Sequence, residues 1–408
     1  MFKSEWDKQR MRQRLPTGWA VLRWSLFVLL LAVLPLLGII AAGRNAAPYL
    51  EMPPTTRFVQ HAGFSLTWFT FFAMADLLLI GGLLWAIRCG QQQQRKGIET
   101  PECPRVLEKA TGAAVFRQPG RLPWWGWAGM ALCLASWLLA WQRFTWFWLF
   151  QPHTFLPIWA GFILAVNALA VKRSGSCLVL RRPIRFLLLF PASAGFWWFF
   201  EYFNRFVQNW YYTGIEGMGP KEYSYYSSLA FATVLPGVLS MIDLLLSFPS
   251  LGKGLASCRP INLPSGRWTP LAALTTASGG LALIGIFPDQ LFALLWVSPL
   301  IIIFSLGALA GQPTLLHRLK IGDWRPVVVP ALAALVCGFF WEMWNFFSLA
   351  RWTYTIPFVQ RFHLFEMPIL GYGGYLPFGL ECMVVGTLVI GDPFGHDNSD
   401  PLSIESAP

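Results

Sequence analysis

Long apolar runs recur along the whole chain, and they limit the folds that it can adopt. A helix needs roughly 20 consecutive apolar residues to cross a bilayer, and ten runs come close to that length. They lie at about 24–42, 64–87, 124–142, 155–171, 184–204, 227–249, 269–287, 290–311, 326–347 and 373–391. We therefore predict an all-α integral membrane protein with about ten transmembrane helices.

The composition agrees with a membrane location. Hydrophobic residues make up 55% of the chain and charged residues only 12%, whereas soluble domains carry roughly 25% charged residues. The net charge of +11 does not indicate nucleic-acid binding, because the basic residues lie in short segments between apolar runs. We expect membrane lipids and a hydrophobic small-molecule substrate as partners, and no nucleic acid.

The distribution of Lys and Arg predicts the orientation. If the N-terminus is cytoplasmic, most of the 31 Lys and Arg residues lie in cytoplasmic segments. Those segments are 1–23, 88–121, 172–185, 250–267 and 318–325. The basic residues on the other side are Arg44, Arg57, Arg143, Arg205, Lys221, Arg351 and Arg361. Because cytoplasmic loops are enriched in Lys and Arg, we predict a multi-pass protein of the inner (plasma) membrane with both termini in the cytoplasm.

One aromatic segment with a buried acid occurs twice. Residues 198–204 (WFFEYFN) and 339–345 (FFWEMWN) are called here the first and second aromatic acid motifs. The interval of 141 residues that joins Glu201 to Glu342 also joins Asn204 to Asn345 and Pro236 to Pro377. With one further residue, Trp210 and Tyr212 correspond to Trp352 and Tyr354. The spacing predicts a tandem repeat of four helices in each copy, both copies facing the same way.

These features divide the chain into five segments. Two leading transmembrane helices precede a polar linker, the two repeats follow, and a short acidic tail ends the chain. The predicted bounds are 1–88 for the N-terminal region, 89–121 for the cytoplasmic linker, 122–249 and 265–391 for the repeats, and 392–408 for a disordered cytoplasmic tail.

The aromatic acid motifs hold the main candidate site. Glu342 and Asn345 are three residues apart and therefore share one face of a helix, as do Glu201 and Asn204. Apolar surroundings disfavour an ionised carboxylate, which suits a general acid or base. We predict that Glu342 is the principal acid and that Asn345 orients its carboxyl. The alternative is structural: the acid and amide tie one helix to its neighbour.

The second copy carries further chemical groups, and we expect the working site there. Glu366 has no counterpart in the first copy, and Ser240 stands where the second copy has Glu381. The predicted catalytic residues are Glu342, Asn345, Glu366, Glu381 and Tyr354. The predicted substrate-binding residues are Trp341, Trp344, Arg351, Trp352, His363, Glu201 and Asn204. Arg351 or Arg361 would neutralise one of the three acids.

Part of the second copy resembles the membrane carotenoid cyclases and hydratases. The residues that carry the resemblance are Glu342, Trp352, Tyr354, Glu366, Pro368 and Glu381, although Met367 and Ile369 flank the proline where that family has a doubled acid. In that family, paired helical units bring carboxylates together to protonate a carbon–carbon double bond of a polyene. The resemblance implies a long, apolar substrate dissolved in the lipid.

Three functions remain open at this level. The first is an enzyme that performs acid–base chemistry on a lipid or isoprenoid near the outer leaflet. The second is a proton-coupled transporter or lipid exporter with a site between the repeats. The third is a structural or sensory membrane protein. The chain has no P-loop, GxSxG or HExxH motif, and its Cys residues form no CxxC pair, so we expect neither a cofactor nor a metal.

Overall fold

The computed structural model describes residues 17–54, 56–95, 120–261, 266–312 and 314–394 of the chain. Within them, each of the ten apolar runs coincides with helix. Seven helical segments are long and apolar enough to cross a membrane: Val21–Ala41, Leu66–Arg95, Gln151–Ser174, Pro183–Val207, Pro220–Leu246, Arg325–Phe346 and Ile369–Ile390. The described chain is therefore a helical protein with the character of a membrane protein. The tail beyond residue 394 and most of the predicted linker lie outside the described residues.

The helices are α2 (Thr17–Ala41), α3 (Leu66–Arg95), α5 (Trp124–Trp141), α6 (Phe155–Ser174), α7 (Leu178–Arg181), α8 (Pro183–Val207), α9 (Pro220–Phe231), α10 (Val234–Leu246), α11 (Pro249–Gly252), α12 (Trp268–Leu283), α13 (Pro288–Leu291), α14 (Leu294–Leu309), α15 (Arg325–Phe346) and α16 (Tyr375–Ile390). The strands are β1 (Trp210–Thr213), β2 (Arg351–Tyr354), β3 (His363–Leu364) and β4 (Met367–Pro368), and a 3₁₀ helix, η6 (Ile369–Gly374), leads into α16.

The structure differs from the predicted helices in three places. Helix α3 continues through Arg95, into the segment predicted as linker. The run predicted at 227–249 forms two helices, α9 and α10, which are interrupted at Ala232 and Thr233. The aromatic loops after the two motifs form short strands, so the fold is not purely helical.

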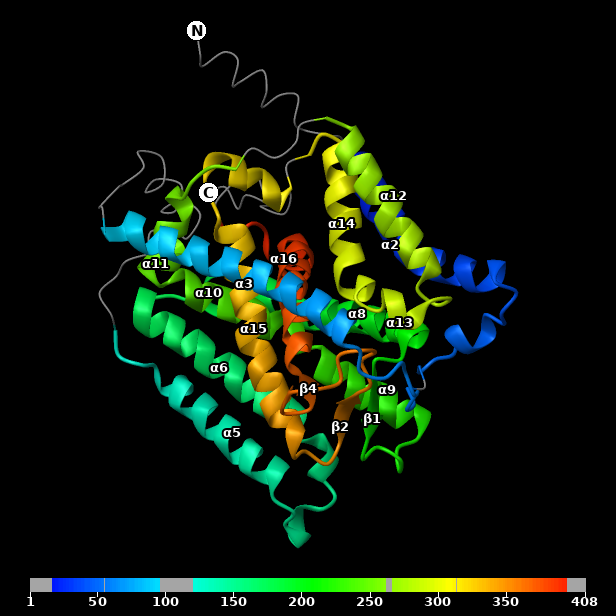
Figure 1. Ribbon diagram of the computed structural model, residues 1–408. Helices are drawn as coiled ribbons and strands as arrows, with labels where there is room; N and C mark the ends of the chain where they lie inside the picture. Colours follow the sequence, from blue (N-terminus) through cyan, green and yellow to red (C-terminus); the bar gives the residue numbers. More distant parts are fainter. Residues whose placement is uncertain (1–16, 55, 96–119, 262–265, 313, 395–408) are drawn as a thin grey trace.

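Four helices form the centre of the molecule. Helix α10 packs against α15, and α16 packs against α8. The antiparallel pair α5–α6 lies on one side of this centre, and the pair α12–α14 lies on the opposite side, beside α2 (Figure 1). Both aromatic acid motifs end central helices, the first at the end of α8 and the second at the end of α15.

The strands that follow these two helices pair with each other. Strands β1 and β2 are antiparallel, with Trp210 opposite Tyr354 and Tyr212 opposite Trp352. Segments about 140 residues apart in the sequence thus join in one two-stranded ribbon. An isolated ribbon of this size is marginal in water, so its stability depends on the helices beneath it.

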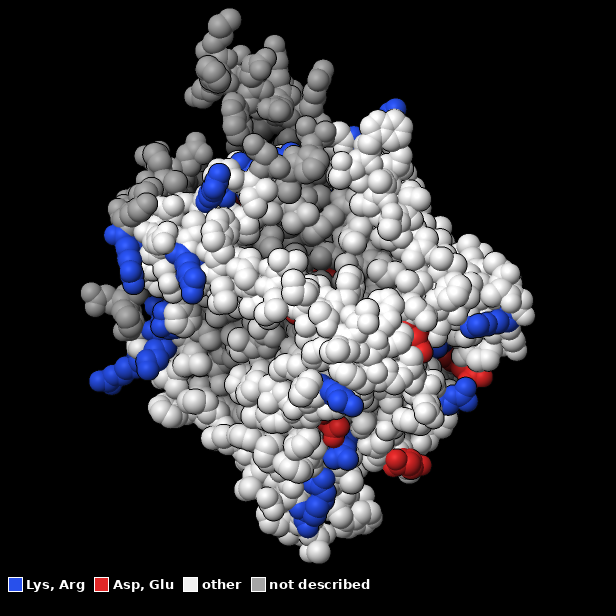
Figure 2. Space-filling view, viewed as in Figure 1, with Lys and Arg blue, Asp and Glu red and all other residues white. Residues whose placement is uncertain are grey.

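The charged side chains leave most of the surface apolar. On the face in Figure 2, Lys and Arg side chains gather at the left, over the left-hand ends of α3 and α6 as Figure 1 draws them. Large apolar side chains cover much of the rest, and α3 alone exposes Leu77 and Leu78. Such a surface is favourable against lipid and unfavourable in water.

Small residues allow α5 and α6 to approach closely. A Cβ atom added at Gly161 would lie 2.5 Å from the backbone nitrogen of Cys133 and 2.7 Å from the carbonyl oxygen of Gly129. Contact between backbones through small residues is the usual way in which helices associate within a membrane, where the hydrophobic effect between helices is absent.

We predict that Gly161→Ala destabilises the protein by about 1–3 kcal/mol, because the added methyl group overlaps the backbone of α5. The measurement is thermal unfolding in detergent. The matched control is Gly195→Ala on α8, where an added Cβ meets no atom within 4 Å. Equal stability of the two variants would contradict the close approach.

Candidate functional site

The Glu342 carboxyl is enclosed by tyrosine hydroxyls. Its side chain is 0% exposed near the end of α15. The hydroxyl of Tyr354 on β2 donates a hydrogen bond to Oε1 at 2.7 Å, and that of Tyr375 on α16 donates to the same oxygen at 2.7 Å. Oε2 has no hydrogen-bond partner within the described chain. The two carboxyl oxygens therefore differ in their environment.

The Glu201 carboxyl has the same arrangement. It too is 0% exposed, and its Oε1 accepts hydrogen bonds from Tyr212 at 2.6 Å, Trp197 at 3.0 Å and Trp210 at 3.1 Å. Its Oε2 also has no partner among the described residues. Each motif thus forms one buried carboxyl centre in which donors converge on a single oxygen.

The two centres differ in the origin of one donor. Trp197, one turn before Glu201, corresponds at an interval of 141 residues to Gly338. A Cβ atom at Gly338 would lie 2.4 Å from the ring of Tyr375, so the tyrosine occupies the space that a larger side chain would fill. Tyr375 corresponds to Val234, which cannot donate. The donor comes from the acid's own helix in the first centre and from the neighbouring helix in the second.

The asparagines do not orient the carboxyls. Asn345 donates from Nδ2 to the carbonyl oxygen of Trp352 at 2.7 Å and accepts from its backbone nitrogen at 2.9 Å. Asn204 likewise donates to the carbonyl oxygen of Trp210 at 2.8 Å. Each amide therefore fixes the start of a strand on the end of a helix. The orienting role that we expected of Asn345 belongs to Tyr354 and Tyr375.

Burial keeps the strand tyrosines protonated. Removal from water, followed by the neighbouring Glu342, raises the pKa of Tyr354 well above its usual value. Burial and Glu201 do the same to the pKa of Tyr212. A neutral phenol donates a hydrogen bond, so both residues remain donors to their carboxyls over the physiological pH range.

Aromatic rings form the wall behind the second centre. The rings of Trp341 and Trp344 pack on Trp159 of α6, with centroids 4.8 and 5.3 Å away. Trp352 packs edge-on against Phe155 at 5.8 Å. The predicted substrate-binding tryptophans therefore lie in one cluster, although Trp341 and Trp344 are buried and now serve to join α6 to α15.

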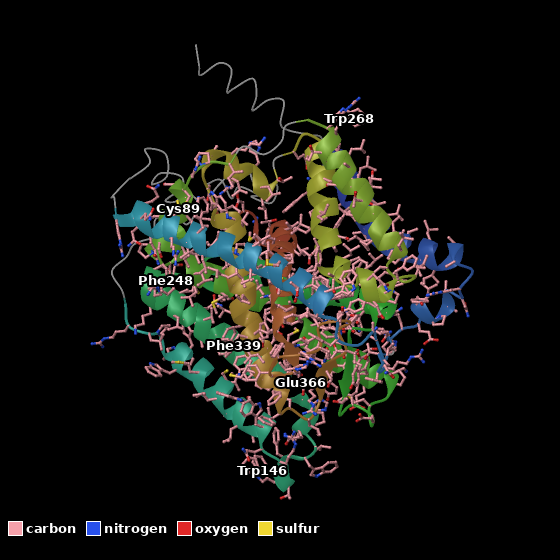
Figure 3. All side chains as sticks on the ribbon, viewed as in Figure 1. Cys89, Trp146, Phe248, Trp268, Phe339 and Glu366 are labelled. Carbon is pink, nitrogen blue, oxygen red and sulfur yellow. The ribbon has the colours of Figure 1, made fainter. Side chains whose placement is uncertain are left out.

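The segment 355–374 covers one face of α15. Phe365 packs against Phe339 and Phe346, with ring centroids 5.6 and 5.8 Å away. Those two residues lie three before and four after Glu342, and therefore on its side of the helix. Glu366 follows Phe365, is half-buried, and lies near the same end of α15 as Phe339 (Figure 3). Phe365 is thus in position to close the approach to Glu342.

The other predicted site residues lie apart from the carboxyl centre. His363 is exposed on β3. Arg351 donates from Nη1 to the carbonyl oxygen of Phe346 at 3.0 Å, so its recorded partner is the end of α15 and not an acid. Glu381 lies further along α16 than Tyr375, and neither of its carboxyl oxygens has a hydrogen bond within the described residues. The structure therefore brings Tyr354 to Glu342 and leaves Glu381 separate.

The sequence analysis missed Tyr375. The residue at the matching position is Val234, so comparison of the two copies gives no reason to select it. The available signal was Gly338, a glycine inside a helix where the first copy has Trp197. A glycine at such a place indicates close approach by another group, which here is the Tyr375 ring.

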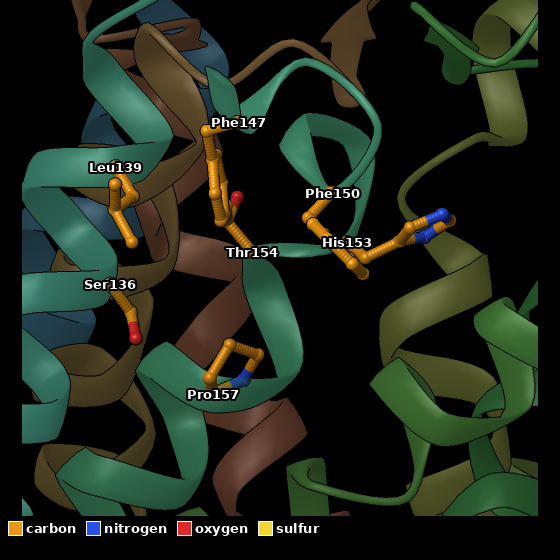
Figure 4. A pocket seen from close by; sticks show the side chains of 7 residues that line it. All are labelled: Ser136, Leu139, Phe147, Phe150, His153, Thr154 and Pro157. Atoms are coloured by element: carbon orange, nitrogen blue, oxygen red, sulfur yellow. The ribbon is translucent and has the colours of Figure 1, made fainter. Parts of the chain in front are cut away.

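A shallow apolar groove lies between α5, α6 and the loop that joins them (Figure 4). Its volume is about 270 Å³, and its lining residues are Ser136, Leu139, Phe147, Phe150, His153, Thr154 and Pro157. Phe155 and Trp352 pack together on the α6 side of the ribbon, so aromatic rings stand between this groove and the carboxyl centre. The groove does not include Glu342.

No metal or relative is indicated for the described structure. Within residues 17–394, apart from the undescribed gaps, no group of three or more His, Cys, Asp and Glu side chains is placed to hold a metal ion. Comparison of the chain with protein-family models, with curated proteins and with solved structures gave no match in any of the three. The chain is a helical protein with apolar helices and buried carboxyls, and its function must be argued from these features.

We predict that Tyr375→Phe and Tyr354→Phe each lower the free energy of unfolding by about 1–2 kcal/mol, because each removes one of the two donors to a buried carboxyl. The measurement is thermal or denaturant unfolding in detergent. Tyr225→Phe, on an exposed face of α9, is the control and should have no effect.

A second prediction tests the exchanged donor. Gly338→Trp alone should be strongly destabilising because the indole overlaps the Tyr375 ring, and Tyr375→Val alone loses a donor and leaves a cavity. The double variant copies the first centre and should recover part of the loss, with an interaction energy of about 1–3 kcal/mol in a double-mutant cycle. Strict additivity would show that the two centres are not built on one plan.

Proposed function

We propose that this protein is a membrane enzyme in which the Glu342 carboxyl transfers a proton to or from a lipid-dissolved, unsaturated substrate. The observation that carries the proposal is the environment of the two carboxyl oxygens. Tyrosine hydroxyls occupy Oε1, and Oε2 has no partner. A proton on this carboxyl would therefore reside on Oε2, where it is available for transfer.

The surroundings of Glu342 favour this chemistry. The site is enclosed and apolar, so water competes weakly for the proton and for the charged state that follows its transfer. When the acid protonates a carbon–carbon double bond, the Oε2–H bond breaks and a C–H bond forms. The carboxylate that remains is stabilised by the two tyrosine hydrogen bonds, which are stronger to an ionised acceptor.

Access to Glu342 requires movement of the segment 355–374. Phe358, Phe362 and Phe365 all adopt left-handed backbone conformations, with φ of 64°, 54° and 58°. Such conformations cost roughly 1–3 kcal/mol each for residues other than glycine, and they persist where the surrounding structure enforces them. We propose that this strained segment opens to admit the substrate and that Phe365 closes over it.

The two halves are proposed to be copies of one four-helix unit. A two-fold axis through the Tyr211–Thr353 pair would exchange Trp210 with Trp352 and Tyr212 with Tyr354, in accordance with the strand register. The packing of α10 on α15 and of α16 on α8 fits the same exchange. We further propose ten spans in an inner membrane with both termini cytoplasmic, and membrane lipids as the neighbouring molecules.

A proton-coupled transporter or lipid exporter is the second candidate. The presence of a carboxyl centre in each half favours it, since matched acids at the interface of two repeats suit alternating access. In that case both Glu201 and Glu342 are needed for proton-driven movement of a substrate, and no chemical product forms. A structural role for both acids is the third candidate.

The test uses solvent deuterium. Membranes that contain the protein are incubated with a total lipid extract in D₂O, and the lipids are analysed by mass spectrometry. We expect a lipid species with carbon-bound deuterium, whose rate of formation falls by about 10²–10⁴-fold in Glu342→Gln, as is typical for loss of a general acid. Glu216→Gln, in the loop after β1, is the control and should retain the full rate.

The outcomes separate the candidates. An active Glu342→Gln variant, or no deuterated lipid in the wild type, would exclude the enzyme. Proton-driven lipid flux that is lost in both Glu201→Gln and Glu342→Gln would favour the transporter. Loss of folding in both variants, with neither activity in the wild type, would favour the structural role.

A further inference from the structure

Glu381 is a buried acid that the proposed chemistry does not use. It lies in α16, where its side chain is 4% exposed. Neither carboxyl oxygen has a hydrogen-bond partner within the described residues, in contrast to Glu201 and Glu342. An acid without donors in an apolar interior is costly, and intramembrane acids of this kind usually have a function.

The matching position of the first half shows that the acid is not required for packing. That position is Ser240, whose hydroxyl accepts a 2.7 Å hydrogen bond from Nδ2 of Asn167. The serine is satisfied within the interior, whereas Glu381 is not. A small, neutral, paired side chain therefore serves in one half of the centre, and an unpaired carboxyl occupies the equivalent place in the other.

An interruption in α14 lies against Glu381. Pro299 stands inside α14, where it removes a backbone donor and weakens the helix locally. The backbone of Leu300, the next residue, lies beside the Glu381 carboxyl without forming a regular hydrogen bond. The hydroxyl of Ser298, the preceding residue, is also buried and unpartnered. Two polar side chains without partners thus accompany the weakest point of this helix.

No described cation is placed to neutralise the acid. The titratable groups recorded nearest to it are the thiols of Cys382 on α16 and Cys337 on α15. Helix α14 contributes no ionisable side chain. On the other elements around α16, the Asp76 carboxylate of α3 lies against Gly373, and Asp243 of α10 is paired with Arg181. Arg182 of α8 donates to the carbonyl oxygen of Ile390, at the far end of α16.

We propose that Glu381 is an exchangeable proton-binding site at the interruption of α14. In the arrangement described here the carboxyl is protonated, because no donor or cation stabilises its charge. Bending of α14 at Pro299 would bring the Ser298 hydroxyl and the free backbone groups to the carboxyl and allow it to ionise. The ligand is a proton, and its binding is linked to the packing of α14 on α16.

The test is modification of the full-length protein in membranes by dicyclohexylcarbodiimide, an apolar reagent. The protonated carboxyl adds across a C=N bond: its proton moves to nitrogen, its oxygen bonds to the central carbon, and an acyl shift to nitrogen then gives a stable N-acylurea. Nothing leaves, and no oxidant is needed. Peptide mass spectrometry locates the adduct.

We expect an adduct at Glu381 that forms roughly tenfold more slowly at pH 9 than at pH 6, because only the protonated carboxyl reacts. Asp243, ion-paired with Arg181, is the internal control and should remain unmodified. Glu342→Gln should leave the reaction at Glu381 unchanged, which separates this site from the proposed catalytic acid. Glu381→Ser, which copies Ser240, should fold and lose the adduct.

Three results would overturn the proposal. Absence of an adduct at Glu381 at every pH would show that the carboxyl is not an accessible acid. A rate independent of pH between 6 and 9 would show that the proton does not exchange. Protection by NaCl, but not by choline chloride at equal concentration, would show that the ligand is a sodium ion and not a proton.

Discussion

The structure depends on the need to satisfy buried carboxyls from within the protein. Glu201 and Glu342 are fully buried at the ends of central helices, so water cannot hydrogen-bond to them in this arrangement. Their donors come from elements distant in sequence: β1 and α8 for Glu201, and β2 and α16 for Glu342. Each acid therefore fixes the position of a strand relative to a helix. The ribbon between β1 and β2 then joins the two centres.

The link between the centres has a consequence for function. Tyr212 donates to Glu201 and lies opposite Trp352, whereas Tyr354 donates to Glu342 and lies opposite Trp210. A movement of β2 that disturbs the Glu342 centre is thereby transmitted to the strand that serves Glu201. This coupling is physical, since it passes through paired backbone and directly bonded side chains. It applies equally to an enzyme with one working site and to a protein with two.

Part of the candidate site was accessible from the sequence. The interval of 141 residues selected Glu201, Glu342 and the tyrosines that follow them, and Tyr354 does reach Glu342. The role of Asn345 was wrong in detail, because an amide three residues away on the same helix found a closer partner in the strand backbone. Tyr375 was missed because the exchange with Gly338 is a contact between two helices, and such contacts leave no trace in the spacing of a single helix.

The sequence by itself determined the class of protein and the location of its helices. Apolar length and charge distribution depend on transfer from water to lipid, which each segment undergoes with its own residues, so these properties can be assessed one segment at a time. Only the tertiary structure decided which acids meet donors, that Glu381 meets none, and that Phe365 covers Glu342. Those outcomes depend on how helices cross and how strands pair, which are relations between distant segments and are not encoded in any one of them.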